Sequence, residues 1–203
     1  MNCRFFVLAV SFAVIQVSYA SDADIIADFV FPSNVTVVDG SFFTSTDMRV
    51  LIGADPPTTF SVLKASLSEF PALDGQSVSY AVLQYPGGSI NPPHIHPHSS
   101  ELLFLLTGSL VVGFIDTSNK LYAKTLQAGD MFVFPKGLVH YQYNKNEQES
   151  SFALSAFGSA NAGLVPVPGA VFTSGISDDV LVKAFKTDII TVQKIKAGLA
   201  PKA

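Results

Sequence analysis

The chain has almost no cysteine and no tryptophan: among 203 residues, Cys3 carries the only thiol. Cys3 lies in an N-terminal segment that we expect to be removed, so the mature protein has no intrachain disulfide and no cysteine nucleophile. Basic residues are also sparse, with 12 Lys and Arg against 16 Asp and Glu and no basic run. Nucleic-acid binding needs clustered Lys and Arg against the phosphates, so we expect no nucleic-acid partner.

The first 20 residues have the pattern of a secretory signal peptide. Arg4 supplies the positive end, residues 5–17 are almost uninterrupted apolar sequence, and residues 18–20 offer small side chains before a cleavage point. We expect a soluble, exported protein that begins at Ser21, because no later run reaches the roughly 20 apolar residues of a membrane span. Removing Arg4 leaves 11 basic against 16 acidic residues, a formal charge of −5. Asn34 begins the only Asn-X-Thr sequon, which we expect to be glycosylated.

Short β-type runs separated by turn residues fill the middle of the chain. These runs cover residues 78–85, 102–106, 110–115, 121–126, 131–134 and 152–157. Strands at this spacing predict an all-β sandwich or barrel, which we place at about residues 58–165.

The C-terminal tail has a different periodicity. Residues 178–185 and 188–196 place apolar side chains at helical spacing, with Ser177 and Thr187 as expected N-caps and Gly198 as the expected stop. We therefore predict one domain over residues 21–203, in which two short helices at about residues 177–198 follow the β-barrel. Their apolar face either covers the barrel or contacts another subunit. That face consists of Val180, Leu181, Ala184, Phe185, Ile189, Val192 and Ile195.

All four histidines lie in two short stretches: three alternate within HIHPH, and His140 follows FPKG. Neutral imidazoles bind divalent transition metals, and Glu101 adds a carboxylate nearby. His94 and His96 are two residues apart, so on a strand both point to one face. On an unbroken strand His98 would be the third ligand beside His94 and His96, and Glu101 would face away. A bulge or bend after Pro97 would instead turn Glu101 toward the two histidines and His98 away from them. Because proline interrupts a sheet ladder, we favour Glu101 as the third ligand.

A strand that begins at His140 places two further polar side chains beside the ion. Gln142 and Asn144 share the face of His140 and offer amides that hydrogen-bond water or a substrate. Three imidazoles and one carboxylate can close a tetrahedral structural zinc site. Around an octahedral ion the same four groups leave two positions open.

Two segments resemble conserved boxes of a plant family. GGSINPPHIHPHSSELLFLLTGSL resembles the first box of the germins and germin-like proteins, and GDMFVFPKGLVHYQYN resembles the second. The likeness extends from the DFV near Asp28 through SNKLYAKTLQAGD to the helical tail. It implies a cupin-type jelly-roll β-barrel, secretion to the apoplast or cell wall, and homo-oligomers, trimers or hexamers, clasped by the C-terminal helices. It also implies manganese as the cofactor, held by His94, His96, Glu101 and His140.

Several positions depart from the family pattern. Val30 replaces the first of the usual two N-terminal cysteines and the second is also absent, so packing or partners must hold the N-terminal arm. His98 replaces the usual Arg, and we expect it at the rim of the site. Oxalate-oxidising germins carry Asn where this chain has Tyr80, although the other two substrate-facing amides, Asn91 and Gln142, are retained. We therefore do not expect oxalate oxidase activity.

Three functions from different classes fit this sequence. The first is manganese-dependent superoxide dismutation, an activity of many germin-like proteins that the resemblance implies, with Gln142 or Asn91 orienting a bound water as the candidate catalytic residues. The second is a binding or receptor protein whose metal coordinates a small carboxylate. The third is a storage (nutrient reservoir) or wall-structural protein. Because storage relatives tend to lose the ligand set, its retention here weighs against pure storage. The family also suggests roles in stress, defence and the cell wall.

Overall fold

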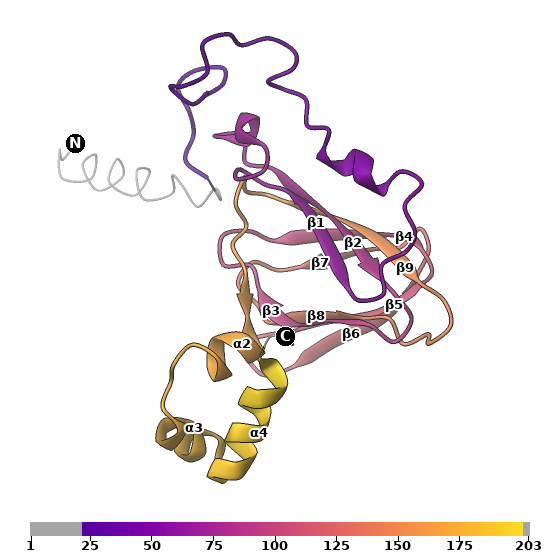
Figure 1. Cartoon of the computed structure of the whole chain (residues 1–203), viewed down its shortest axis with the longest axis vertical. Coiled ribbons are helices and arrows are strands. Elements are labelled where there is room, and N and C mark those ends of the chain that lie inside the picture. Colours follow the sequence, from indigo (N-terminus) through magenta and orange to yellow (C-terminus); the bar gives the residue numbers. More distant parts are fainter. Residues whose placement is uncertain (1–21, 201–203) are drawn as a thin grey trace, which may run out of the picture.

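Two five-stranded antiparallel sheets face each other across the core (Figure 1). The computed structural model describes residues 22–200, so the predicted signal peptide and Ser21 lie outside the described residues. The first sheet has the order β1 (Ser61–Ala65), β2 (Ser79–Tyr85), β9 (Ser151–Phe157), β4 (Glu101–Thr107) and β7 (Met131–Phe134). The second sheet has the order β10 (Val165–Pro166), β3 (Ile90–Ile95), β8 (His140–Tyr143), β5 (Ser109–Ile115) and β6 (Leu121–Gln127).

Alternation along the strands decides which side chains enter the core. On β4, Leu103 and Leu105 point into the core and are fully buried, whereas Leu102 points to the other face of the sheet and is 46% exposed. The buried core consists of Ala81, Leu83, Tyr85, Leu103, Leu105, Leu110, Val112, Leu126, Phe134 and Ala153. Removing this apolar surface from water is the main force that holds the two sheets together. The all-β jelly-roll prediction is thus confirmed.

The six β-type runs predicted from the sequence are all strands, and their ends agree within one residue. β1 and β10, which each lie at the edge of a sheet, were not predicted. β1 is preceded by a long N-terminal arm, residues 22–60, in which the only helical turn is the 3-10 helix η1 (Asp47–Leu51). A second 3-10 helix, η2 (Pro71–Leu73), lies between β1 and β2.

The N-terminal arm is held without a disulfide. Asp22 anchors its beginning, because the carboxylate accepts hydrogen bonds from Ser159 Oγ at 2.6 Å and from the Ala160 backbone N–H at 2.8 Å. Around Val30, which replaces the family's cysteine, four aromatic rings pack in pairs with centroids 5.0 to 6.1 Å apart. The pairs are Phe29–Phe31, Phe29–Phe43 and Phe42–Phe43. Packing therefore takes the place of the covalent link.

The C-terminal tail contains three helices, α2 (Val167–Phe172), α3 (Asp178–Phe185) and α4 (Ile189–Leu199). α2 contacts β3, and α4 packs against both α2 and α3. Figure 1 shows these helices at one end of the barrel rather than over a sheet face. Leu181 and Val192 are buried between the helices, whereas Val180 and Phe185 of the same face are each more than half exposed. The apolar face is therefore only partly used within this chain.

The boundaries of the tail helices differ in part from the prediction. α3 has the predicted bounds, and Ser177 is its N-cap residue, although its side chain makes no capping bond. The prediction of Thr187 as the cap of α4 is wrong, because Asp188 is the N-cap and its carboxylate accepts from the Thr191 N–H. Gly198 does not stop the helix, which runs to Leu199. Within residues 22–200, no helix has both the length and the apolar character needed to cross a membrane.

Candidate metal centre

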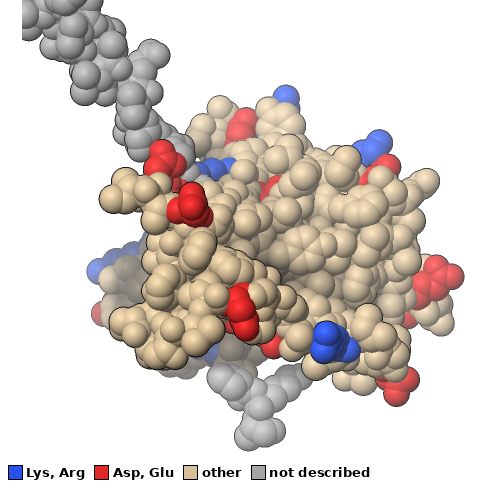
Figure 2. Space-filling model, turned by 90° about the horizontal axis from the view of Figure 1, so that it is seen from above, with Lys and Arg blue, Asp and Glu red and all other residues tan. Residues whose placement is uncertain are grey.

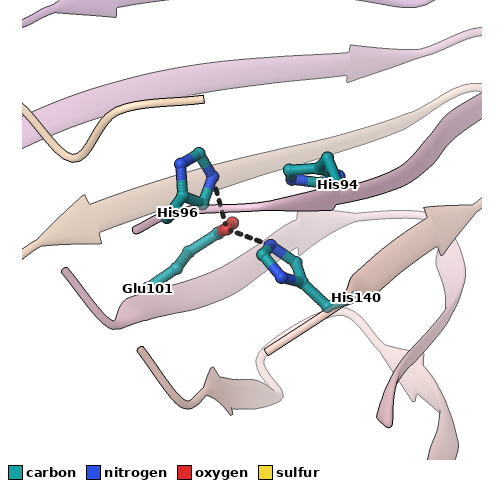
Figure 3. Close-up of side chains that lie close together, drawn as sticks. All are labelled: His94, His96, Glu101 and His140. Atoms are coloured by element: carbon teal, nitrogen blue, oxygen red, sulfur yellow. Dashed lines mark hydrogen bonds and ion pairs between the residues drawn. The ribbon is translucent and has the colours of Figure 1, made fainter. Parts of the chain in front are cut away.

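Four side chains from both sheets meet at one end of the barrel interior (Figure 3). His94 lies on β3, His96 directly follows β3, Glu101 begins β4 and His140 begins β8. One potential ligand atom from each of these residues lies within 4.8 Å of all the others. His94 and His140 are directly paired across β3 and β8, whereas Glu101 comes from the opposite sheet. The cluster therefore joins the two sheets at this end of the barrel.

The loop between β3 and β4 decides which residues enter the cluster. The chain bends at Pro97 and His98, as the proline predicts, and the bend brings Glu101 inward, where it is 2% exposed. His98 points away from the cluster, is exposed, and its Nδ1 lies 2.9 Å from the carbonyl oxygen of Asn161. Gly163 packs against the bend with φ +69°, and a Cβ at this position would lie 2.9 Å from Pro97 Cγ. Glycine is therefore required there.

The three clustered histidines are all oriented by the protein backbone. In each ring Nδ1 lies within hydrogen-bond distance of a carbonyl oxygen. The pairs are His94 with Pro92 at 2.8 Å, His96 with Gly163 at 2.6 Å, and His140 with Leu138 at 2.9 Å. Because a carbonyl oxygen only accepts, each Nδ1 carries the proton, and a neutral ring then has an unprotonated Nε2. This is the tautomer that binds a metal through Nε2.

The two carboxylate oxygens of Glu101 have different partners. Oε2 lies 3.3 Å from His96 Nε2 and 3.2 Å from His140 Nε2, the two contacts drawn in Figure 3. Oε1 accepts hydrogen bonds from Ser155 Oγ at 2.6 Å and from Gln142 Nε2 at 3.4 Å. One oxygen is thus bonded to the protein scaffold, while the other faces the imidazoles.

The electrostatics of the cluster favour a bound cation. Burial alone raises the pKa of Glu101, but hydrogen bonds and positive charge from His140 and His96, which both require a proton on Nε2, outweigh burial and lower the pKa to about 2. Burial, followed by the charge of His140, lowers the pKa of His94 to about 4. At neutral pH the site therefore contains an ionised carboxylate and a neutral imidazole.

The donor set itself tests whether a metal fits. With the imidazole protons on Nδ1, two Nε2 lone pairs face Glu101 Oε2 at 3.2 and 3.3 Å, and only an added proton or a cation can hold these atoms together. Adding protons puts positive charge on buried rings, which is costly. A divalent ion replaces those protons without that cost, because metal binding displaces protons from its ligands. Nitrogen and carboxylate ligands in this number suit a transition metal.

Gln142 lies behind Glu101 rather than in open space. Its Oε1 accepts from Asn91 Nδ2 at 2.7 Å and from the Tyr85 hydroxyl at 3.4 Å, and the residue is fully buried. Burial and then the charge of Glu101 raise the pKa of Tyr85 well above its usual value, so the phenol remains a donor. Asn91 lines the cavity in front of the cluster. Gln142 therefore orients the carboxylate, and Asn91 is the amide nearer to an entering molecule.

Asn144 does not have the role expected from its spacing. It directly follows β8 and is fully buried, and its Nδ2 contacts three backbone carbonyl oxygens at 2.7 to 3.3 Å. These belong to Tyr85, Pro86 and Glu149. The prediction of an amide beside the ion is wrong for Asn144, which instead fastens the loop after β8 to the end of β2.

Two residues that support the cluster belong to no recognisable motif. Ser155 on β9 and Tyr85 on β2 become neighbours of Glu101 and Gln142 only when distant strands pair. The alternation of apolar residues along these strands is a signal that both side chains point inward. It does not identify the groups that they meet.

Tyr80 lies on the outer side of its strand. It is directly opposite Ala156 on β9 and is 38% exposed. The inward positions of β2 are instead Ser79, Ala81 and Leu83, which are all buried. None of these side chains carries an amide, so β2 directs no amide at the cluster.

A cavity of about 270 Å³ opens onto the cluster. His94, His96 and Glu101 form part of its wall together with Asn91. Seven other wall residues are apolar, namely Phe60, Val62, Ala81, Leu83, Phe157, Ala162 and Leu164. The remaining wall residues are Lys64, Ser66, Ser79, Tyr80, Asn161 and Gly163. Its size suits a small molecule, since ligand pockets of about 300 to 1,000 Å³ accommodate drug-sized compounds.

The fold and the cluster match those of known proteins. The family model for cupins matches residues 54–193. Germin-like protein 9-3 of Oryza sativa subsp. japonica is 55% identical over 202 residues, which cover 96% of this chain and 94% of that protein. The rhicadhesin receptor of Pisum sativum is 44% identical over 173 residues, 84% of this chain and 77% of that protein.

A solved structure with a bound ligand has the same architecture. Oxalate oxidase in complex with the substrate analogue glycolate superimposes with a TM-score of 0.77 at 29% identity, covering 90% of this chain and 100% of that chain. Together with the cupin match and the extended identity to germin-like relatives, this likeness agrees with the two sequence boxes. The chain therefore belongs to the germin-like proteins of the cupin family, as a member that lacks the usual N-terminal cysteine pair.

Proposed function

We propose that this protein is a secreted manganese-binding protein of the plant apoplast or cell wall, in which His94, His96, Glu101 and His140 hold the ion. The convergence of unprotonated imidazole nitrogens on one oxygen of Glu101 carries the proposal. Each imidazole is fixed by a backbone carbonyl and the carboxylate is fixed by Ser155, so the ligands are oriented before the metal arrives. Such preorganisation favours tight binding of the metal.

We propose superoxide dismutation as the activity of this centre. Bound manganese supplies the one-electron chemistry that converts two superoxide ions and two protons into dioxygen and hydrogen peroxide. The chain's own contribution is to orient the small anion and to admit protons from water. Asn91 lines the cavity and its amide is held by Gln142 Oε1, so its remaining polar atoms are available to the entering molecule.

Oxalate oxidation is not part of the proposal. β2 directs Ser79, Ala81 and Leu83 toward the cavity, where an oxalate-oxidising germin is expected to carry an amide. Alanine and leucine cannot hydrogen-bond an oxalate oxygen, so one of the three amides expected around the substrate is missing.

Binding of a small carboxylate without turnover is the second candidate function. The cavity in front of the cluster is lined mainly by apolar side chains, which suits a ligand with an organic body better than it suits superoxide. The similar oxalate oxidase was solved with glycolate, a small carboxylate, and one relative is named a receptor. Isothermal titration of the metal-loaded protein with glycolate, followed by analysis for products, separates binding from catalysis.

We also propose that the protein forms homo-oligomers, trimers or hexamers, through its helical tail. Val180, Phe185 and Ile190 are more than half exposed on the tail. Figure 2 shows the molecule from above Figure 1, the side away from the tail, and on that face acidic and basic side chains are dispersed over a mostly uncharged surface. Contact between subunits would remove these apolar side chains from water. Sedimentation equilibrium of the wild type and of Phe185→Lys tests the proposal, and an unchanged mass in the variant contradicts a role of this face.

Secretion and glycosylation are testable on the same preparation. Asn34 lies in an exposed turn, which is accessible to a glycosyltransferase. Protein recovered from the medium of plant cells is expected to begin at Ser21 and to lose its glycan mass in Asn34→Gln. An intact residue 1 in the recovered protein argues against cleavage of a signal peptide.

The decisive experiment combines metal analysis with a superoxide dismutation assay on one sample. About one manganese ion per chain, with metal and activity both lost in His140→Ala, supports the proposal. His98→Ala is the matched control, because His98 is exposed and lies outside the cluster. If the sample contains zinc or no metal and has no activity, the result favours a binding or structural protein. Activity that survives loss of the metal contradicts the enzyme proposal.

A further inference from the structure

A row of three side chains crosses the inner face of the first sheet and ends at a residue that contacts the metal centre. Lys64 on β1 is directly opposite Ala81 on β2, and Ala81 is directly opposite Ser155 on β9. Directly opposite residues of antiparallel strands lie on the same face. Ser155 in turn donates to Glu101 Oε1. Lys64 therefore lies in line with Ser155, two strands away from it, while Glu101 lies in the neighbouring inward row, opposite Phe157.

The space between Lys64 and the centre is open and apolar. Ala81 has a small side chain, so the middle of the row does not block the cavity. Neighbouring strands are about 4.8 Å apart, which places the backbones of Lys64 and Ser155 about 10 Å from each other. Val62 and Leu83 form the next row, and both line the cavity together with Lys64 and Glu101.

The ammonium group of Lys64 is not used in an ion pair within residues 22–200. The ion pairs of this region involve His96, His140 and Lys196 instead. The charge of Lys64 helps to lower the pKa of Glu69, but the Glu69 carboxylate accepts its hydrogen bonds from Ser66 and Ser68. A cation thus stands at the mouth of an apolar cavity whose other end holds the metal ligands.

We propose that the cavity binds an organic acid with two anionic groups separated by a short apolar chain. One carboxylate of this ligand lies at the metal centre, and the other pairs with Lys64. The inference rests on the proposed metal centre and extends it to a class of ligand. Oxalate is too short to reach both groups, because its two carboxylates are directly bonded. A chain of several methylenes spans the gap and packs against the apolar wall of the cavity, and each buried methylene strengthens binding about fourfold.

The test compares acids of graded length by isothermal titration into metal-loaded protein. The probes are oxalate, succinate and adipate, together with hexanoate, which has the length of adipate but only one carboxylate. Adipate is expected to bind about threefold to fivefold more tightly than hexanoate and more tightly than oxalate, because an exposed charge pair contributes up to about a factor of five. Equal affinities for adipate and hexanoate overturn the inference.

Lys64→Met isolates the contribution of the ammonium group. Lys64 is exposed, so the variant is expected to fold and to retain its metal and its hexanoate affinity, while the preference for adipate disappears. Lys124→Met is the matched control, since Lys124 is an exposed lysine of β6 outside the cavity. A preference that persists in Lys64→Met overturns the inference. Protein that binds no metal refutes the proposed function at the first step, whereas loaded protein without the preference refutes the inference alone.

Discussion

Ser155 donates its hydroxyl hydrogen to Glu101 Oε1 across 2.6 Å, at the carboxylate oxygen that does not face the histidines. The bond joins β9 to the first residue of β4 and fixes the rotation of the carboxylate. Oε2 is thereby directed at His96 and His140. A residue outside the candidate ligand set thus determines where a ligand oxygen lies.

Ser155→Ala is expected to weaken metal binding about 10-fold to 100-fold, the usual effect of losing a group that orients a metal ligand. Competition against a chelator of known affinity measures the change. Ser151→Ala is the control, because Ser151 is a buried serine of the same strand whose hydroxyl donates to the Ser109 carbonyl instead. Equal metal affinity in wild type and Ser155→Ala would show that the carboxylate needs no such support.

Metal-free protein is expected to lose stability as the pH falls from about 6.5 to about 4. The pKa of His94 is lowered to about 4 by burial, so between these values the unfolded chain binds a proton that the folded chain excludes. Stability therefore rises with pH across this window, by an amount on the order of 3 kcal/mol. Below it, stability falls further as Glu101 is protonated between its ordinary pKa of 4.5 and its lowered pKa of about 2. Denaturant unfolding at a series of pH values measures both changes.

His94→Leu separates this effect from general acid sensitivity. Leucine cannot take up a proton, so the pH dependence between 6.5 and 4 is expected to flatten. His98→Asn removes an exposed imidazole outside the cluster and is expected to retain the wild-type dependence. A slope that is unchanged in His94→Leu would assign the acid sensitivity to other groups.

Local patterns were sufficient to predict most of the barrel. Alternation on β4 and β9 indicated which side chains are buried, and the turn residues located the strand ends. The proline in HIHPH was sufficient to favour Glu101 over His98, because it predicts a break in the strand and the chain bends there. These properties depend only on neighbours in sequence.

Properties that depend on strand pairing could not be predicted in the same way. Spacing gave Asn144 the face of His140, but the carbonyls that it meets come from β2 and the following loop. Tyr80 occupies the sequence position of a site amide, yet the register of β2 with β9 turns it outward. Lys64 and Ser155 become members of one row only through two pairings of distant strands.

Asn144→Ala is expected to lower the free energy of unfolding by about 2 kcal/mol, because buried carbonyl oxygens lose their donor. Metal content is expected to remain unchanged, since the amide does not face the cluster. Chemical denaturation and elemental analysis measure the two quantities. Asn146→Ala is the control from the same loop, because Asn146 is exposed and water can replace its bonds. If the variant loses metal but keeps the wild-type free energy of unfolding, Asn144 has a role in metal binding instead.

Asp188→Ala is expected to lower the melting temperature more than Thr187→Ala, although the two residues are adjacent and both types cap helices. Asp188 Oδ1 accepts from the Thr191 N–H at 2.9 Å and Oδ2 accepts from Thr191 Oγ1 at 2.8 Å, and its negative charge lies at the start of α4. The same bonds lower the pKa of Asp188, so its contribution is present above the ordinary pKa of 3.8 and is lost as the pH falls further. Thermal unfolding at pH 7 and at pH 3, at one fixed protein concentration, measures the difference. The gap between the variants should narrow at pH 3, and an equal gap at both pH values would show that Asp188 acts without its charge.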